Sequence, residues 1–104
     1  MRTRICRRDD LRPGEVKRFD VAKHRVAVVR VDDTFYALGD LCSHAEASLA
    51  EGEVFCDSLE LECPQHGSAF SLTTGEALTL PATQPVPVYT VTVVGDDVFL
   101  EIGQ

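Results

Sequence analysis

The residues of this chain that could form a chemical site lie in two short Cys/His pairs. Cys42 and His44 form the first pair, Cys63 and His66 form the second, and each pair sits in a turn-like stretch. Each loop therefore carries a thiolate and an imidazole, which are both common metal ligands. Two such loops side by side would offer two sulfurs and two nitrogens, so the pattern predicts a metal site.

The order of these ligands bears on which metal centre they would form. Structural zinc sites with two cysteines and two histidines usually place both cysteines first and both histidines later. Here the order along the chain is Cys, His, Cys, His. A two-iron centre with two cysteines and two histidines instead takes one residue of each kind from each loop. The order favours the iron centre, and a structural zinc module that serves as a binding domain stays open as an alternative.

With these residues the chain resembles the Rieske 2Fe-2S ferredoxins, whose signature is C-x-H, a gap and then C-x-x-H. The gap here is residues 45–62, and the second loop continues in the manner of that family with the sequence GSAF at residues 67–70. Residues 80–83, LPAT, resemble the proline-containing segment that covers the cluster in such proteins. The resemblance extends over most of the chain.

The resemblance implies one Rieske-type 2Fe-2S cluster and a role for each ligand. Cys42 and Cys63 would hold the inner iron, and His44 and His66 would hold the outer iron. Thiolates donate strongly and stabilise ferric iron, whereas neutral imidazoles donate less, so the histidine-bound iron is easier to reduce. The incoming electron is therefore expected mainly on the outer iron, and its imidazoles are the expected electron port.

Four further residues are expected to tune the cluster: Ser68, Phe70, Gln65 and Pro81. High-potential Rieske proteins of the respiratory type resemble this chain but carry two bridged cysteines, where Ala47 and Gln65 stand here. They also use a serine and a tyrosine hydroxyl to stabilise the reduced cluster. Ser68 matches that serine, but Phe70 has no hydroxyl. We therefore predict a potential in the lower part of the range of roughly −150 to +300 mV that Rieske centres span.

Strands and turns account for nearly the whole chain. Runs rich in β-branched and aromatic residues predict strands at residues 16–21, 26–31, 34–38, 53–55, 59–61, 69–72, 77–78, 89–93 and 98–102. Three prolines exclude a helix from residue 80 to residue 88. No long window shows an apolar period of 3.6 residues, so the pattern predicts an all-β antiparallel sandwich or partial barrel.

The chain of 104 residues has the length of one domain. The family resemblance implies a base of antiparallel sheet from about residues 1–40 and 84–104. A cluster-binding subdomain from about residue 41 to residue 83 would be inserted into that base. The cluster loops would then hang from the ends of hairpins.

The net charge and the N-terminal sequence indicate which partners and which compartment to expect. Lys and Arg number 10 against 17 Asp and Glu, which gives a formal net charge of −7 and a sequence pI of about 4.8. This balance argues against nucleic acid and suits basic partners. Residues 1–10 have no apolar core of a signal peptide, and no run approaches the roughly 18 apolar residues of a membrane span. We expect a cytoplasmic protein, independent of membranes, with reduced cysteines.

Three residues that could bind metals are not expected to do so. Cys6 and Cys56 have no histidine at ligand spacing and are interpreted as small, partly buried thiols. His24 lies between two basic residues and is interpreted as a solvated surface residue.

The sequence predicts an electron carrier rather than an enzyme. It shows no nucleophile and base pair, no glycine-rich phosphate loop and no open metal position. The resemblance implies single-electron transfer from an NAD(P)H-dependent flavoprotein ferredoxin reductase to a terminal non-haem iron oxygenase, of the kind that hydroxylates aromatic rings in aromatic hydrocarbon catabolism. A carrier that exposes its cluster to two partners in turn is expected to be a monomer.

Two alternatives of the same fold stay open. One is a Rieske protein associated with iron-sulfur assembly, which the sequence does not separate from a dioxygenase ferredoxin. The other is a protein like the small subunit of nitrite reductase, although members of that group commonly lack the cluster ligands that are present here.

Overall fold

The computed structural model describes residues 2–43, 47–65, 67–80 and 82–102. These residues form two antiparallel β-sheets and two single-turn 3-10 helices, and none of them lies in an α-helix. The all-β prediction is confirmed. No helix in this part of the chain has the length and apolar character that a membrane crossing requires.

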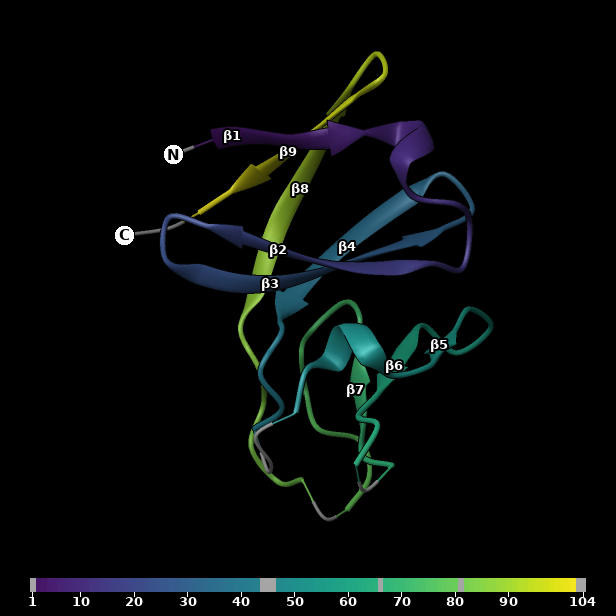
Figure 1. The fold of residues 1–104 in the computed structure, drawn as a ribbon. Coiled ribbons are helices and arrows are strands. Elements are labelled where there is room, and N and C mark those ends of the chain that lie inside the picture. The colour runs from purple at the N-terminus through teal and green to yellow at the C-terminus, as the bar shows by residue number, and fades with distance from the viewer. Residues whose placement is uncertain (1, 44–46, 66, 81, 103–104) are drawn as a thin grey trace.

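The larger sheet has six strands in the order β1-β9-β8-β4-β3-β2 (Figure 1). It draws on both ends of the chain, with β1 (Arg2–Arg7), β2 (Val16–Val21), β3 (His24–Val31), β4 (Thr34–Gly39), β8 (Val88–Val94) and β9 (Asp97–Glu101). The sheet curves enough that its two edge strands approach each other. Residues 3–5 of β1 and residues 19–22 at the end of β2 line one cavity of about 370 Å³. The large sheet is therefore a partial barrel.

The hairpins β2–β3 and β3–β4 match the predicted strands and turns. Both pairs are antiparallel and run without a register shift. Their tight turns need left-handed backbone, which Ala22 and Lys23 adopt in the first turn, at φ of 49° and 69°. Asp32 adopts it in the second, at φ of 53°. Aspartate tolerates this conformation better than most residues, and Asp32 lies in the short gap between the predicted strands 26–31 and 34–38.

β3 is buried on both faces because it lies between two hydrophobic cores. One core, here called the barrel core, fills the inside of the large sheet and consists of Cys6, Leu11, Val26, Val28, Phe35, Ala37, Val98, Leu100 and Ile102. The other, here called the junction core, consists of Ala27, Val29, Val31, Leu38, Cys42, Ala47, Leu49, Leu61, Cys63, Phe70, Leu72, Ala82 and Val86. Double burial explains why residues 26–29 are a continuous apolar run instead of an alternating one.

A second sheet of three short strands packs against the junction core. It has the order β5-β6-β7, with β5 (Val54–Phe55), β6 (Glu60–Glu62) and β7 (Ala69–Ser71). The 3-10 helix η2 (Leu49–Glu51) precedes it, and Figure 1 shows this half of the molecule below the large sheet. The predicted strand at residues 77–78 is present only as one isolated bridge, between Phe70 and Ala77.

One strand was not predicted from the sequence. β1 (Arg2–Arg7) pairs with β9 along the edge of the large sheet, and it leads into the 3-10 helix η1 (Arg8–Asp10). Arginines occupy three of its six positions, and Cys6 is its only buried residue. An edge strand needs little apolar character of its own when a neighbouring strand supplies the ladder. The pairing is instead supported by an Arg4 to Asp97 ion pair of 2.8 Å.

Candidate metal centre

The first Cys/His loop is closed at its base by backbone contacts. The amide of Cys42 donates to the carbonyl of Ala47 at 3.0 Å, and the flanking residues Leu41 and Ser48 form an isolated antiparallel bridge. Cys42 is only 4% exposed. The loop therefore starts from a closed neck that holds its cysteine inside the protein.

The second loop repeats this geometry. The amide of Cys63 donates to the carbonyl of Ser68 at 2.7 Å, and the amide of Gly67 donates back to the carbonyl of Cys63 at 3.1 Å. Gly67 adopts a positive φ of 74°, which glycine reaches without strain. Cys63 is 1% exposed. In both loops the cysteine amide thus binds the carbonyl five residues later.

Backbone contacts hold the two loops beside each other. Both cysteines belong to the junction core. Gly52, directly after η2, lies so close to the strand that leads into Cys63 that a Cβ atom on it would overlap the carbonyl oxygen of Glu62. The amide of Glu62 also donates to the carbonyl of Glu53 at 2.9 Å. The two thiols are therefore brought into one buried region by fixed main-chain contacts.

A third segment, residues 82–86, ties both loops together. The hydroxyl of Ser43 in the first loop donates to the carbonyl of Gln84 at 2.6 Å. The amide of Ala82 donates to the hydroxyl of Ser68 in the second loop at 3.1 Å. This segment follows the proline that the sequence analysis assigned to a covering loop. Its contacts with both loops are those expected of a cover.

The residues predicted for the site are described to different extents. Cys42, Cys63, Ser68 and Phe70 are buried, while Gln65 is exposed on the second loop. The remaining three predicted residues, His44, His66 and Pro81, lie outside the described residues. Among the described residues no group of three metal-binding side chains comes together, and two of the four proposed ligands are not among them. The ligand assignment therefore remains a prediction.

The described part of the site fits a 2Fe-2S cluster. Two thiols come from two matching loops and both are buried, and thiolates are the soft ligands that iron-sulfur clusters select. Ser68 is 1% exposed, and its hydroxyl accepts a hydrogen bond from the Ala82 amide, which leaves the hydroxyl proton as a donor. Such a donor is one of the groups that tune iron-sulfur clusters.

The sequence analysis missed the residue that anchors the first loop. No role was assigned to Asp40 from the sequence. In the structure its carboxylate is fully buried and binds the hydroxyl of Ser48 and the amide of Ala50. The available signal was an acidic residue directly after a buried strand and two positions before a predicted ligand cysteine.

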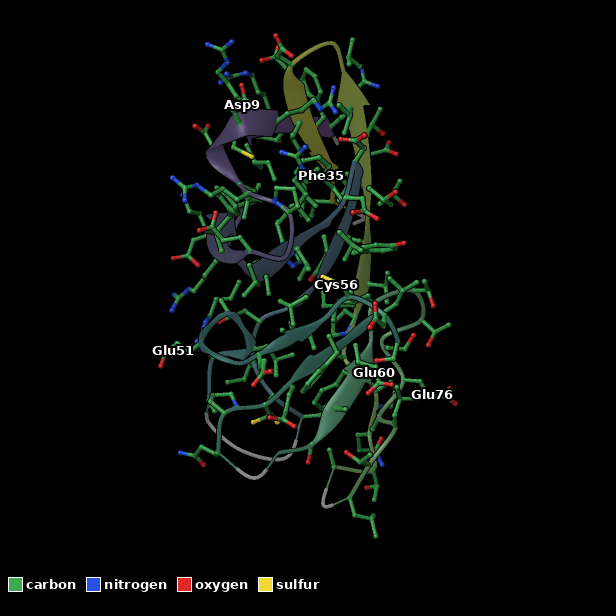
Figure 2. All side chains as sticks on the ribbon, turned by 90° about the vertical axis from the view of Figure 1, so that its right-hand side faces the viewer. Asp9, Phe35, Glu51, Cys56, Glu60 and Glu76 are labelled. Carbon is green, nitrogen blue, oxygen red and sulfur yellow. The ribbon has the colours of Figure 1, made fainter. Side chains whose placement is uncertain are left out.

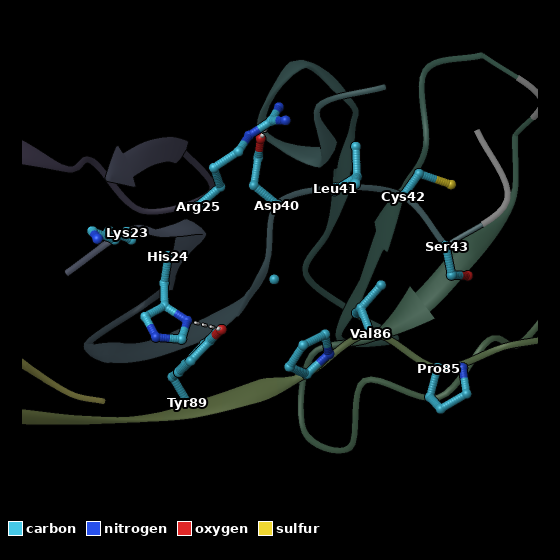
Figure 3. Close-up of a pocket in the computed structure, with 12 residues that line it drawn as sticks. Lys23, His24, Arg25, Asp40, Leu41, Cys42, Ser43, Pro85, Val86 and Tyr89 are labelled. Carbon is cyan, nitrogen blue, oxygen red and sulfur yellow. Dashed lines mark hydrogen bonds and ion pairs between the residues drawn. The ribbon is translucent and has the colours of Figure 1, made fainter. Parts of the chain in front are cut away.

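A cavity of about 480 Å³ lies next to the first loop (Figure 3). Its lining runs from Arg25 and Asp40 through Cys42 and Ser43 to the proline segment. His24 lines the same cavity. It is half-buried and binds the Tyr89 hydroxyl at 3.3 Å, so it is less solvated than predicted.

The two remaining cysteines lie apart from the loops. Cys6 is buried in the barrel core, where removal from water raises the pKa of its thiol, and nearby Asp10 acts in the same direction. This thiol therefore stays protonated and suits packing more than metal binding. Cys56 is exposed and lies in the β5–β6 turn near the large sheet, as Figure 2 shows.

Known proteins resemble this chain over nearly its full length. The 3-phenylpropionate/cinnamic acid dioxygenase ferredoxin subunit of Escherichia coli (strain K12) is 42% identical over 99 residues, which are 95% of this chain and 92% of that protein. The ferredoxin of carbazole 1,9a-dioxygenase from Nocardioides aromaticivorans IC177 has a TM-score of 0.94 and 42% identity, covering 96% of both chains.

A further solved structure shows such a protein with its partner. It is described as a complex of reduced oxygenase and oxidised ferredoxin in carbazole 1,9a-dioxygenase. The matched chain has a TM-score of 0.87 and 39% identity, and the match covers 95% of this chain and 91% of that one.

The family model of the Rieske [2Fe-2S] domain matches residues 1–90. That match includes both Cys/His loops, the junction core and the segment that joins the loops. Together with relatives that are 42% identical over nearly the whole chain, it leads to one conclusion: this protein is a member of the Rieske [2Fe-2S] family.

Proposed function

We propose that this protein is the ferredoxin of a ring-hydroxylating dioxygenase system. It carries single electrons from an NAD(P)H-dependent flavoprotein reductase to a terminal non-haem iron oxygenase. The observation that carries the proposal is the 42% identity, over 95% of this chain, to a ferredoxin subunit of a dioxygenase. The protein is an electron-transfer component and not itself an enzyme.

We assign the cluster ligands as Cys42 and Cys63 for one iron and His44 and His66 for the other. The matching loop geometry of the two cysteines supports this set, because each thiol is buried at the same position of an equivalent loop. When bound, a Rieske 2Fe-2S cluster accepts and releases one electron. The same proposal divides the chain into a base, residues 1–40 and 84–104, and a cluster-binding subdomain, residues 41–83.

The residues around the ligands control water and hydrogen bonding. Burial of both thiols in the junction core keeps water from them. Ser68 supplies one hydroxyl to the cluster region, whereas Phe70, fully buried in the same core, supplies none. Pro81 and Gln65 complete the set as shaping residues of the cover and of the second loop. One available hydroxyl supports a potential in the lower part of the Rieske range.

Its charge supports brief encounters with partners that carry basic surfaces. The formal net charge is −7, and Figure 2 shows Glu51 and Glu76 pointing outward on opposite sides of the lower half. Such a field speeds encounter and weakens as salt increases. The proposal takes the protein to act as a cytoplasmic monomer, because a shuttle must present the same cluster to reductase and oxygenase in turn.

The first experiment tests for the cluster itself. Iron and zinc are measured in the purified protein, and an EPR spectrum is recorded after reduction with dithionite. We expect about two irons per chain and the rhombic signal of a histidine-ligated cluster. A colourless protein with one zinc and no iron would make the chain a structural module and end the proposal.

The second experiment tests the partners. This chain replaces the ferredoxin in a reconstituted 3-phenylpropionate dioxygenase system that contains reductase and oxygenase but lacks its own ferredoxin. We expect product formation that depends on NADH and on this chain, and no product with a Cys63→Ser variant. A cluster-bearing protein that is reduced by neither this nor a carbazole dioxygenase reductase would favour the role in iron-sulfur assembly.

A further inference from the structure

Asp40 is the only charged side chain that is fully buried in the part of the chain that the structure describes. It lies between the end of β4 and Cys42, so it belongs to the stem of the first ligand loop. Burial of a carboxylate is unfavourable unless hydrogen bonds and an opposite charge compensate it. A charge kept in this place therefore needs a structural or electrostatic reason.

The carboxylate connects both stems of the loop. Its oxygens accept hydrogen bonds from the Ser48 hydroxyl at 2.7 and 2.9 Å and from the Ala50 amide at 2.9 Å. The backbone carbonyl of Asp40 accepts the Leu49 amide at 2.7 Å. Asp40 precedes the loop, and these three partners follow it. One residue thus closes the loop where the large sheet ends.

Arg25 provides the compensating charge from β3. Its Nη2 lies 3.4 Å from the carboxylate of Asp40, and its carbonyl accepts the Asp40 amide at 2.9 Å. The two ends of this ion pair differ in environment, because the Asp40 side chain is 0% exposed and that of Arg25 is 42% exposed. Figure 3 shows the pair at the wall of the cavity that also contains Cys42. Solvent and salt therefore screen the arginine much more than the aspartate.

We propose that Asp40 is a positioning residue of the first ligand loop and that the Asp40–Arg25 pair helps to set the reduction potential of the bound cluster. The inference rests on the proposed cluster at Cys42. A buried negative charge beside this loop disfavours the addition of an electron, and a nearby positive charge favours it. The carboxylate, which is less screened, lowers the potential more than the guanidinium raises it.

The experiment compares the reduction potentials of the cluster-bearing wild type, Asp40→Asn and Arg25→Gln. The Asp40→Asn side chain keeps an oxygen for the Ala50 amide but has no charge. We expect Asp40→Asn to raise the potential and Arg25→Gln to lower it. The first change should alter the ratio of reduced to oxidised protein at fixed potential about three- to tenfold, or about 30 to 60 mV for one electron. The Arg25→Gln change should be smaller and should shrink further as salt increases.

The matched controls are Asp33→Asn and Arg18→Gln. Asp33 forms ion pairs with Arg8 and Arg30, and its own side chain is 79% exposed. Arg18 pairs with Asp20, whose side chain is 62% exposed, so neither control touches a fully buried charge. Neither control should move the potential. Shifts of the same sign in Asp40→Asn and Arg25→Gln, or an Asp40→Asn shift no larger than that of Asp33→Asn, would overturn the electrostatic role.

Hydrogen exchange tests the positioning role separately. In Asp40→Asn we expect faster exchange in residues 40–52 than in the wild type, and unchanged exchange in the β8–β9 hairpin. Unchanged exchange in residues 40–52 would overturn the positioning role. If Asp40→Asn does not fold, the potential of Arg25→Gln is compared with that of Arg18→Gln. A lower potential in Arg25→Gln supports the role of the Asp40–Arg25 pair, and equal potentials in the two variants overturn it.

These readouts also separate the inference from the proposed function. The potential is measured on the isolated protein, so it depends on neither reductase nor oxygenase. A chain that holds the cluster but supports no dioxygenase would leave the test intact. A chain without iron would fail the iron analysis first, which identifies the earlier assumption as the wrong one.

Discussion

The two Cys/His loops have the same local geometry but are held by different means. In each, the cysteine amide donates to the carbonyl five residues later. The second loop is the turn of the β6–β7 hairpin, whose ladder continues to the pair Glu62–Ala69. The first loop closes on one isolated bridge, Leu41–Ser48, and on the buried carboxylate of Asp40.

This difference shows how a metal site can be built from unequal supports. A sheet ladder fixes the second loop through backbone hydrogen bonds that almost any sequence could make. The first loop lies between a strand and a 3-10 turn, where no ladder continues, so a side chain must satisfy the free amides. The first loop should therefore be most sensitive to substitution of Asp40. The second loop should be most sensitive to substitution of Gly67 and Ser68.

Loss of either cysteine should have the largest effect and should erase the difference between the loops. We expect Cys42→Ser and Cys63→Ser each to abolish iron binding, because each loop supplies one thiolate. Iron content and the EPR signal of the reduced protein measure this. The control Cys56→Ser should keep both, since that thiol is exposed and outside the junction core. A normal cluster in either loop variant would show that the ligand assignment is wrong.

A substitution that forces the two loops apart should have the next largest effect on the bound iron. In Gly52→Ala the new methyl group would overlap the carbonyl of Glu62, which is backbone and cannot move aside without displacing Cys63. We expect a loss of about 3 kcal/mol in the free energy of unfolding and reduced iron content. Urea unfolding measures the stability.

The control for this variant is Gly95→Ala in the β8–β9 turn. Gly95 has a positive φ of 62°, but no atom beyond its two chain neighbours lies within 4 Å of the position that a Cβ would take. Backbone strain alone should cost it about 1 to 2 kcal/mol, with full iron content. Equal iron content in both variants would mean that the loops do not depend on this contact.

Two serines link the loops to the covering segment, residues 82–86. Here the side chain of the second loop, Ser68, should matter more for stability than that of the first loop, Ser43. Ser68→Ala leaves the Ala82 amide without its partner in a buried place, and we expect a loss of about 1 to 3 kcal/mol. Ser43→Ala removes an exposed link to Gln84, where water replaces it, and should cost less than about 1 kcal/mol. Thermal unfolding of both variants measures the difference, and a larger loss in Ser43→Ala would contradict it.

Addition of a single hydroxyl at Phe70 should have the smallest effect, a change in the reduction potential alone. Phe70→Tyr places a donor in the core that contains both cysteines, and we expect a higher reduction potential. A net hydrogen bond of about 1 kcal/mol corresponds to about 40 mV for one electron. The control Phe35→Tyr adds the same group to the barrel core and should leave the potential unchanged. An unchanged or lower potential in Phe70→Tyr would remove the explanation for a low potential.

Local patterns were sufficient for most of the strands. The β2–β3–β4 meander was predicted because β-branched runs alternate with short polar turns, and these are local preferences. The edge strand β1 was not, because its arginine-rich sequence becomes a strand only through pairing with β9, which is far away in the chain. The 3-10 turn η2 was also missed, since three residues are too few for a periodic signal.

The sequence by itself was enough to identify the family, through two Cys/His pairs whose residue types and order are typical of a Rieske centre. Only the tertiary structure decided how the loops are supported. The approach of Gly52 to Glu62, the link from Ser43 to Gln84 and the burial of Asp40 join residues that no short-range pattern relates. Ligand type is a property of single residues, whereas burial and support depend on which distant segments pack together.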